Sequence, residues 1–220
     1  MDRRRYRSFW LVVVGILVVS VCQVKGEENR KISVNLVSNP SFKQPANNTG
    51  AQAELWTNYQ CGYTRTKEKS YATDVSGPWS CKITGAGGEN EKGVGGAYTY
   101  IRSGLPEHGT FTATNNIYIT PGTRGTIRDI YIIVYYTDKT LERITDVLTP
   151  EQISANLDKW KTYSRTFSTA PEKKIDYVVY WCIVWLTYEK KFTGTVYFDE
   201  AELKLADEKV GASAPLPPAK

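Results

Sequence analysis

The stretch IDYVVYWCIVWLTY, from Ile175 to Tyr188, is apolar and aromatic on both of its alternating faces. This pattern is typical of a strand that is covered on both sides, as in a sandwich of two packed sheets. One alternating set predicts an ordinary core face: Val178, Tyr180, Cys182, Val184 and Leu186. The other set is rich in rings and predicts either a second buried layer or a platform for a flat ligand: Tyr177, Val179, Trp181, Ile183 and Trp185.

The remainder of the chain predicts further strands to pack with this one. From Lys31 onward, short extended runs alternate with turn residues, which is typical of an all-β sandwich. Thr149-Pro150-Glu151-Gln152 forms a capping box with Pro at the first helical position, so we expect one short helix over residues 150–159, with Ile153, Leu157 and Trp160 on one face. The expected strands are Ile32–Val37, Asn58–Thr66, Trp79–Thr84, Gly96–Arg102, Thr110–Ile119, Ile127–Thr137, Thr162–Ser168 and Thr195–Leu205.

Residues 1–26 have the layout of a secretory signal peptide, with basic residues, an apolar run from Phe9 to Val21 and a small residue at Gly26. The run is shorter than the roughly 20 residues of a membrane-spanning helix, and the alternative is an uncleaved N-terminal anchor in a membrane. This leader carries five basic residues and one acid, so the formal net charge falls from +5 to +1 without it. The charge therefore gives no support to nucleic-acid binding. We expect a secreted or cell-surface protein with a β-sandwich domain over residues 31–206 and a disordered Pro/Ala-rich tail over 207–220.

Cysteine and histidine usage limits the chemistry that the domain can perform. Beyond the leader, Cys61 and Cys81 are candidates for a disulfide in an oxidising compartment, with free thiols as the alternative, while Cys182 is read as a small core residue. Their spacing does not match a zinc site. The single histidine, His108, lies in a turn, and nothing near it suggests a catalytic triad. These residues point away from histidine-dependent catalysis and histidine-based metal sites.

Carboxylates offer one route to catalysis, because a glycosidase needs two of them. Asp199, Glu200 and Glu202 cluster near the C-terminal end of the domain, with Glu200 and Glu202 on one face of the expected strand. The other reading is a solvated edge strand. The glycine-rich stretch from Gly85 to Gly96 matches neither a dinucleotide fingerprint nor a phosphate loop, and we read it as a surface loop.

Aromatic residues give the positive functional signal. Several expected strands place Tyr or Trp beside Asp or Arg on one face, and sugar rings stack their C–H faces on such side chains. Packing alone is the alternative, since Tyr and Trp are common in half-buried strands. The candidate ligand-binding residues are Trp181, Trp185, Tyr177, Tyr131 and Tyr135 as the platform, with Asp129 and Arg102 as hydrogen-bonding partners.

The ends of the domain carry a resemblance. Asn35-Leu36-Val37-Ser38-Asn39-Pro40-Ser41-Phe42 resembles the opening N-L-x-x-N-P-x-F of jelly-roll carbohydrate-binding modules, which belong to the galactose-binding-like domains. Val196-Tyr197-Phe198-Asp199-Glu200-Ala201-Glu202-Leu203 resembles their closing V-Y-F-D-D-V-x-L strand. The resemblance implies a jelly-roll β-sandwich that binds a polysaccharide. It also implies a structural calcium with Asp199 as a ligand, although Lys43 stands where the family usually has an acid.

Three functions follow as hypotheses. The first is a secreted, non-catalytic protein that binds a polysaccharide or glycan by aromatic stacking and hydrogen bonding. The second is a structural subunit of a cell-surface or envelope layer, in which the aromatic face makes protein contacts, including self-association. The third is a small glycan hydrolase that uses the carboxylates near Asp199.

Overall fold

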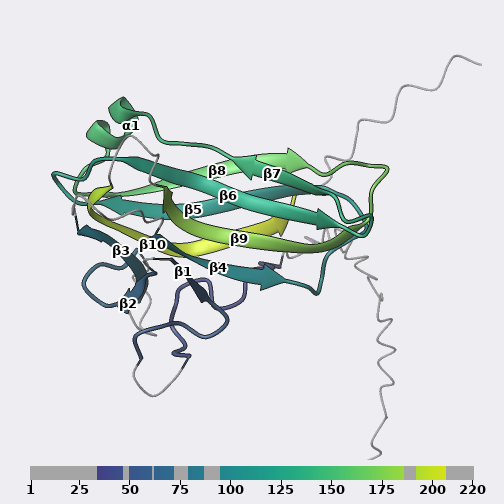
Figure 1. The fold of residues 1–220 in the computed structure, drawn as a ribbon, viewed down its shortest axis with the longest axis horizontal. Coiled ribbons are helices and arrows are strands. Elements are labelled where there is room, and N and C mark those ends of the chain that lie inside the picture. The colour runs from purple at the N-terminus through teal and green to yellow at the C-terminus, as the bar shows by residue number, and fades with distance from the viewer. Residues whose placement is uncertain are drawn as a thin grey trace, which may run out of the picture. The chain divides into compact units, whose positions relative to one another are not determined.

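The computed structural model describes residues 34–46, 50–60, 62–71, 79–86, 95–185 and 192–206, which form two antiparallel five-stranded sheets packed face to face (Figure 1). The first sheet has the order β1-β4-β9-β6-β7 and the second has the order β2-β3-β10-β5-β8. This architecture confirms the expected all-β sandwich. The strands are β1 Thr57–Gln60, β2 Thr64–Thr66, β3 Ser80–Ala86, β4 Gly95–Ile101, β5 Thr110–Ile119, β6 Thr126–Tyr136, β7 Leu141–Thr145, β8 Trp160–Ser168, β9 Ile175–Trp185 and β10 Thr193–Leu205.

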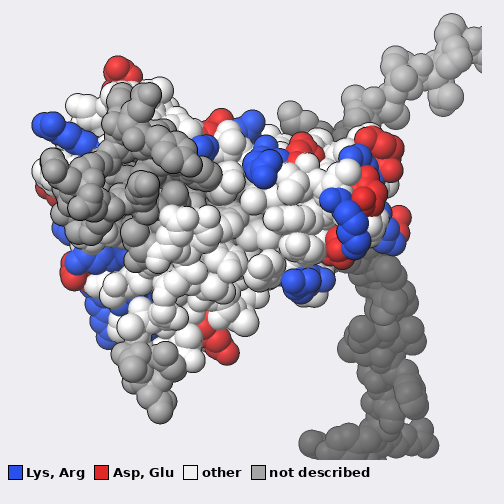
Figure 2. Space-filling model, in the orientation of Figure 1, with Lys and Arg blue, Asp and Glu red and all other residues white. Residues whose placement is uncertain are grey.

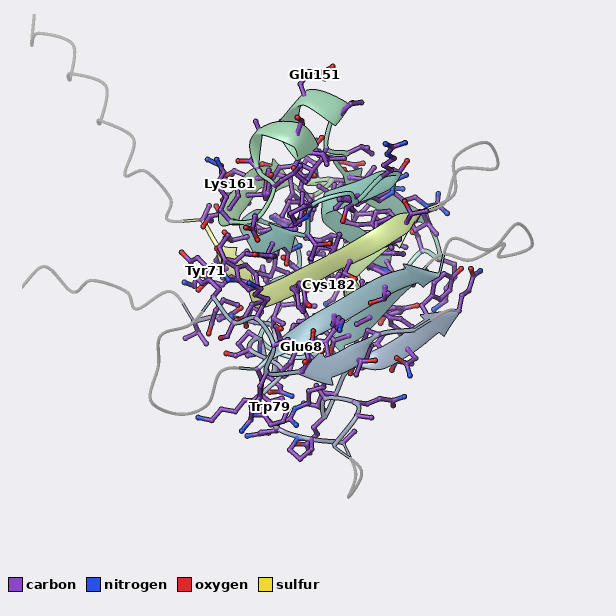
Figure 3. The ribbon with its side chains drawn as sticks, turned by 90° about the vertical axis from the view of Figure 1, so that its left-hand side faces the viewer. Glu68, Tyr71, Trp79, Glu151, Lys161 and Cys182 are labelled. Carbon is purple, nitrogen blue, oxygen red and sulfur yellow. The ribbon has the colours of Figure 1, made fainter. Side chains whose placement is uncertain are left out.

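The stretch that predicted the fold is β9, the central strand of the first sheet, paired with β4 on one side and β6 on the other. Val178, Tyr180, Cys182 and Val184 are at most 1% exposed and lie between the sheets (Figure 3). The opposite set, which includes Val179 and Ile183, packs into a separate cluster on the outer face of the same sheet. One alternating face of β9 therefore packs in the core between the sheets, as the sequence predicts. The other face packs in a separate cluster on the outer side of the first sheet.

The opening segment of the domain contacts the closing strand. The Leu36 N–H donates to the Leu203 carbonyl at 2.8 Å, and the Ala201 N–H donates to the Pro40 carbonyl at 3.2 Å. Asn35 adds two side-chain hydrogen bonds to the same part of β10. Residues 34–37 are nevertheless irregular, so the expected first strand is wrong over its described part.

The helix α1 spans Pro150–Ala155 and is shorter than predicted. Its N-terminus is as expected, with the Thr149 hydroxyl accepting from the Gln152 N–H and the Gln152 side chain accepting from the Thr149 N–H. The helix ends early because Leu157 forms a parallel bridge with Ile119 and Trp160 begins β8. The predicted apolar face that joined Ile153 to Leu157 and Trp160 is therefore wrong.

Two strand predictions need correction. The expected strand Asn58–Thr66 is two strands in different sheets, because Gln60 and Gly62 both have positive φ values, 48° and 75°, and the chain turns there. The edge strand β7 has no counterpart in the prediction, and its outward positions are solvent-exposed, so it lacks the continuous apolar signal of the central strands.

Several predictions lie outside the described residues. The signal peptide over 1–26, the tail over 207–220 and the thiol of Cys61 fall in this category, and they stay predictions. Cys81, the proposed partner of Cys61, is a fully buried free thiol in the structure. Across the described ranges, we find no helix with the length and hydropathy of a membrane span.

Candidate functional site

The outer face of the first sheet gathers aromatic side chains from four neighbouring strands. The strand register aligns Tyr98 of β4 with Trp181 of β9, and Trp181 with Tyr131 of β6. Two residues further along, Tyr100 is level with Val179, and beyond it Tyr177 is level with Tyr135. We call this surface the aromatic face, defined by Tyr59, Tyr98, Tyr100, Tyr131, Tyr135, Tyr177 and Trp181.

Trp181 lies at the centre of one end of the aromatic face. Its ring centroid lies 4.6 Å from that of Tyr98, 5.0 Å from that of Tyr59 and 5.8 Å from that of Tyr131. The side chain is half-buried, while the indole nitrogen is buried and has no hydrogen-bond acceptor among the described residues. Because this nitrogen is covered, Trp181 can offer a ligand the carbon surface of its ring but not its N–H group.

The other end of the aromatic face is built on a stacked tyrosine pair. The rings of Tyr135 and Tyr177 are 4.5 Å apart and inclined by 14°. The Arg102 guanidinium lies 4.7 Å from the Tyr177 ring centroid and 5.0 Å from that of Tyr100. Tyr100 is 47% exposed, and Arg102 is also exposed. The structure therefore brings Tyr177, Tyr135 and Arg102 together, as the sequence predicts.

Beneath the exposed rings lies a buried floor. Tyr131, Ile133, Val179 and Ile183 are between 1% and 7% exposed and form a cluster that is separate from the core between the sheets. Tyr131 was predicted as a platform residue, but at 7% exposure it supports Trp181 from below and presents little surface to a ligand. Burial of the floor holds the outer rings in fixed positions, because its members pack against them.

Asp129 does not share the aromatic face, and this prediction is wrong. A β-bulge between Arg128 and Tyr131 places two residues, Asp129 and Ile130, opposite Cys182 alone. Since Cys182 faces the sandwich interior, the alternation predicted from the sequence breaks at this point. Burial raises the pKa of Asp129. Burial also raises the pKa of the Tyr163 hydroxyl on the second sheet, and the nearby Asp129 adds to that rise.

The visible middle of the aromatic face shows no charged side chain. Figure 2 shows this side of the molecule, where grey atoms cover part of the sheet and the surface beside them, over its middle, is white. An uncharged aromatic surface of this kind suits a neutral ring, because water leaves both partners on contact. Trp185 ends β9, but its side chain lies outside the described part of the structure, so its predicted role stays a prediction.

Asp199 does not fit the calcium site that the resemblance implies. Its buried carboxylate accepts hydrogen bonds from the Tyr71 N–H at 2.8 Å, the Glu200 N–H at 2.8 Å and the Ser70 hydroxyl at 3.2 Å. Calcium requires a shell of oxygen acceptors, whereas these groups are donors. Within the described ranges, no three His, Cys, Asp or Glu side chains are grouped to hold a metal.

An arginine holds the carbonyls of the opening segment instead. The Arg65 guanidinium donates to the Phe42 carbonyl through Nε at 2.5 Å, to the Lys43 carbonyl through Nη2 and to the Gly50 carbonyl through Nη1 at 3.3 Å. It is 7% exposed and lies 3.3 Å from the centroid of the Trp79 ring. The backbone oxygens beside Lys43, where the resemblance expects an acid, therefore already contact a cation.

The carboxylates proposed for catalysis do not converge. Glu200 has a positive φ of 47° and accepts from the Ser41 hydroxyl at 2.8 Å, whereas Glu202 forms an ion pair with Lys204 at 2.8 Å. A register shift in β10 lies between Asp199 and Glu202, so the strand is irregular at Glu200. These acids are therefore occupied by structural contacts.

Two features of the site escape sequence reasoning. Tyr59 lies in the expected strand Asn58–Thr66 but is not among the candidate ligand-binding residues; in the structure it lies on β1 and contacts Trp181 edge to face. Arg143 lies level with Ile133 on the unpredicted strand β7 and is exposed. The alternation in Thr57–Gln60 was the available signal for Tyr59, while no local pattern reveals which strand borders β6.

No protein-family model and no curated protein matches the sequence of this chain. Solved structures do match. The xylan-binding domain CBM22-1 of Xyn10C from Paenibacillus barcinonensis is 14% identical, with a TM-score of 0.51, over 79% of this chain and 95% of that one. A family 16 carbohydrate-binding module is 15% identical, with a TM-score of 0.51, over 77% of this chain and 99% of that one.

A third similar structure belongs to a larger chain. The enzymatically active domain of tailspike protein 4 from bacteriophage CBA120 is 14% identical, with a TM-score of 0.53, over 79% of this chain and 22% of that one. At these identities the likeness concerns the fold. The chain therefore has the jelly-roll β-sandwich fold of carbohydrate-binding modules.

Proposed function

We propose that this protein is a secreted, non-catalytic carbohydrate-binding protein that holds a polysaccharide across the aromatic face. The observation that carries the proposal is the row of half-exposed rings over β4 and β9, with an uncharged centre and a buried floor. Rings fixed in this way lose little conformational freedom when a sugar stacks on them, which favours binding. The similarity to a xylan-binding domain makes a xylan chain the first ligand to test.

The structural arrangement supports recognition over hydrolysis. The acids proposed for catalysis, Glu200 and Glu202, contact Ser41 and Lys204 and are separated by a strand irregularity. A glycosidase needs a pair of carboxyl groups that face a bound sugar, whereas these two acids are engaged by neighbouring side chains. No Asp or Glu side chain occupies an outward position among the paired residues of β4, β9 and β6, so a sugar bound there would contact aromatic rings and arginines.

The decisive experiment is affinity electrophoresis of the mature protein in gels that contain xylan. Trp181→Ala and Tyr100→Ala should each weaken binding at least tenfold, about 1.4 kcal/mol, because each removes ring surface from the proposed contact. Trp160→Ala is the matched control, since Trp160 is a half-buried aromatic residue on β8 of the opposite sheet. Circular dichroism should show that all three variants are folded.

Two results would contradict the proposal. Equal losses in Trp181→Ala and Trp160→Ala would show that binding does not depend on the aromatic face. If the folded protein retains no polysaccharide and instead forms concentration-dependent oligomers in sedimentation experiments, the structural-subunit hypothesis replaces it, with the aromatic face as a protein contact.

A further inference from the structure

Arginines border the aromatic face without acids among them. The strand register assigns outward positions on four adjoining strands, and they are occupied by aromatic, aliphatic and Thr residues together with Arg102, Arg128 and Arg143. Aspartate and glutamate are absent from these outward positions. Asp176, next to Tyr177 in the sequence, lies 4.0 Å from the Lys139 ammonium and is paired with it.

The opposite sheet differs in its charge arrangement. There, Lys82 forms an ion pair with Glu68 at 2.7 Å, and Lys204 forms one with Glu202 at 2.8 Å. On the aromatic face, neither Arg102 nor Arg143 forms an ion pair within the described residues. Arg102 and Arg143 are therefore exposed cations with no acid partner among the described residues.

The arginines are spaced along the direction in which β9 runs. The backbone of Arg128 is level with Ile183, but its guanidinium contacts Thr145 and the Tyr131 ring, at the level of Trp181. Arg102 extends the β4 register to the level of Tyr177, four residues from Trp181 along β9. At about 3.4 Å for each residue, these two levels are roughly 14 Å apart. Arg143 lies between them in level and borders the β6 side. The guanidinium groups thus flank a track long enough for several sugar rings.

Arg102 is held ready for an anion. Its guanidinium lies 4.7 Å from the centroid of the Tyr177 ring and 5.0 Å from that of Tyr100, and the side chain is exposed. The N–H donors of a guanidinium form a planar fork that matches the two oxygens of a carboxylate or a sulfate. The rings supply the contact with the sugar, and the arginine supplies a partner for a charged substituent.

We propose that the ligand of the aromatic face is an anionic polysaccharide, whose sugars carry carboxylate or sulfate groups that the bordering arginines bind. This inference rests on the proposed function and adds a ligand class to it. Its neutral backbone stacks on Trp181 and Tyr100, and its charges contact Arg102 and Arg143.

The test compares polymers that share a backbone and differ in charge. Binding of the mature protein is measured by affinity electrophoresis with glucuronoxylan against neutral arabinoxylan, and with dextran sulfate against dextran. The charged member of at least one pair should bind at least fivefold more tightly, and the pair that responds identifies carboxylate or sulfate as the recognised group. Added salt should reduce this preference, because exposed charges are screened.

Arginine variants test whether the preference for charged polymers depends on the aromatic face. Arg102→Gln and Arg143→Gln should each weaken binding of the charged polymer two- to fivefold, the range of an exposed ion pair, and leave the neutral polymer unchanged. Lys161→Gln is the control, because it removes one exposed charge from β8 of the other sheet (Figure 3). An equal effect of Lys161→Gln would show unspecific attraction and overturn the inference.

The failures of the two proposals are distinguishable. Equal affinity for the charged and neutral members, lost on Trp181→Ala, would overturn the anionic preference and leave carbohydrate binding in place. If no polymer of either pair binds to the folded protein, both proposals fall.

Discussion

Replacing Arg65 by Met should destabilise the domain more than any comparable change of a surface arginine. The guanidinium contacts three backbone carbonyls of the opening segment, and two of these contacts, to Phe42 and Lys43, are close. Methionine keeps an unbranched side chain that fills similar space but donates no hydrogen bond. The perturbation therefore removes the donors with little change in packing.

The expected loss can be worked out from these contacts. Each hydrogen bond to a charged group contributes about 1.5–3 kcal/mol, so the two close bonds account for roughly 3–6 kcal/mol. Burial lowers the pKa of Arg65, so the buried cation itself carries a desolvation cost that the variant escapes. We expect a net loss of about 3 kcal/mol in the free energy of unfolding. For a domain of this size, the corresponding fall in Tm is about 6–12 °C.

Urea unfolding followed by tryptophan fluorescence measures this loss as a lower midpoint at an unchanged slope. Arg65→Lys should recover part of it, since an ammonium reaches fewer carbonyls than the planar fork. Arg143→Met is the matched control, because Arg143 is exposed and its loss should change stability by less than about 0.5 kcal/mol. Equal urea midpoints for Arg65→Met and Arg143→Met would contradict the stabilising role of the Arg65 contacts.

Three further changes probe the scaffold. Gly194→Ala should lower the free energy of unfolding in urea by more than about 2 kcal/mol, because φ is +95° and a Cβ would lie 2.4 Å from Thr123 Oγ1. Gly122→Ala is the control: φ is +81°, no atom lies within 4 Å of the added Cβ, and the loss should be about 1 kcal/mol. Equal losses in the two variants would contradict the predicted clash at Gly194. Burial raises the pKa of Asp129, so the folded state is favoured while this carboxyl is protonated and loses that contribution as pH rises through the raised value. Asp129→Asn should therefore raise the urea midpoint at pH 7 but not at pH 3. A lower midpoint of the variant at pH 7 would contradict the prediction, because it would show that the charged carboxylate stabilises the folded state. Tyr180→Phe should cost about 1 kcal/mol, because its buried hydroxyl donates to the Thr114 carbonyl at 2.7 Å, and a neutral effect would show that another donor replaces it.

The local pattern is sufficient wherever one strand decides its own environment. The alternation of β9 places Tyr180 and Cys182 inside and Trp181 outside, because successive side chains point to opposite faces. β5 begins and ends where its flanking turn residues predict, and the capping box starts α1 at Pro150. These features depend on neighbours in the sequence, so the sequence contains the information.

The prediction fails where a distant segment changes the local geometry. The bulge that turns Asp129 inward adds a residue to β6 opposite β9, and nothing in the pattern of β6 alone reveals it. The helix ends at Ala155 because Leu157 pairs with Ile119, a residue almost forty positions earlier. Neither contact has a local signature, since both depend on how the sheets are assembled.

Periodicity and turn residues act over a few positions, and they are enough to predict a β-sandwich with a ring-rich central strand. They do not show which rings reach the surface: in the assembled sheets Tyr131 is buried as a floor, while Tyr100 and Arg102 are exposed beside Tyr177. Nor do they show that Arg65 contacts the carbonyls beside Lys43, or that Asp199 accepts from backbone N–H groups. Exposure and contact depend on which strands become neighbours, and that order is set by packing between residues far apart in the chain.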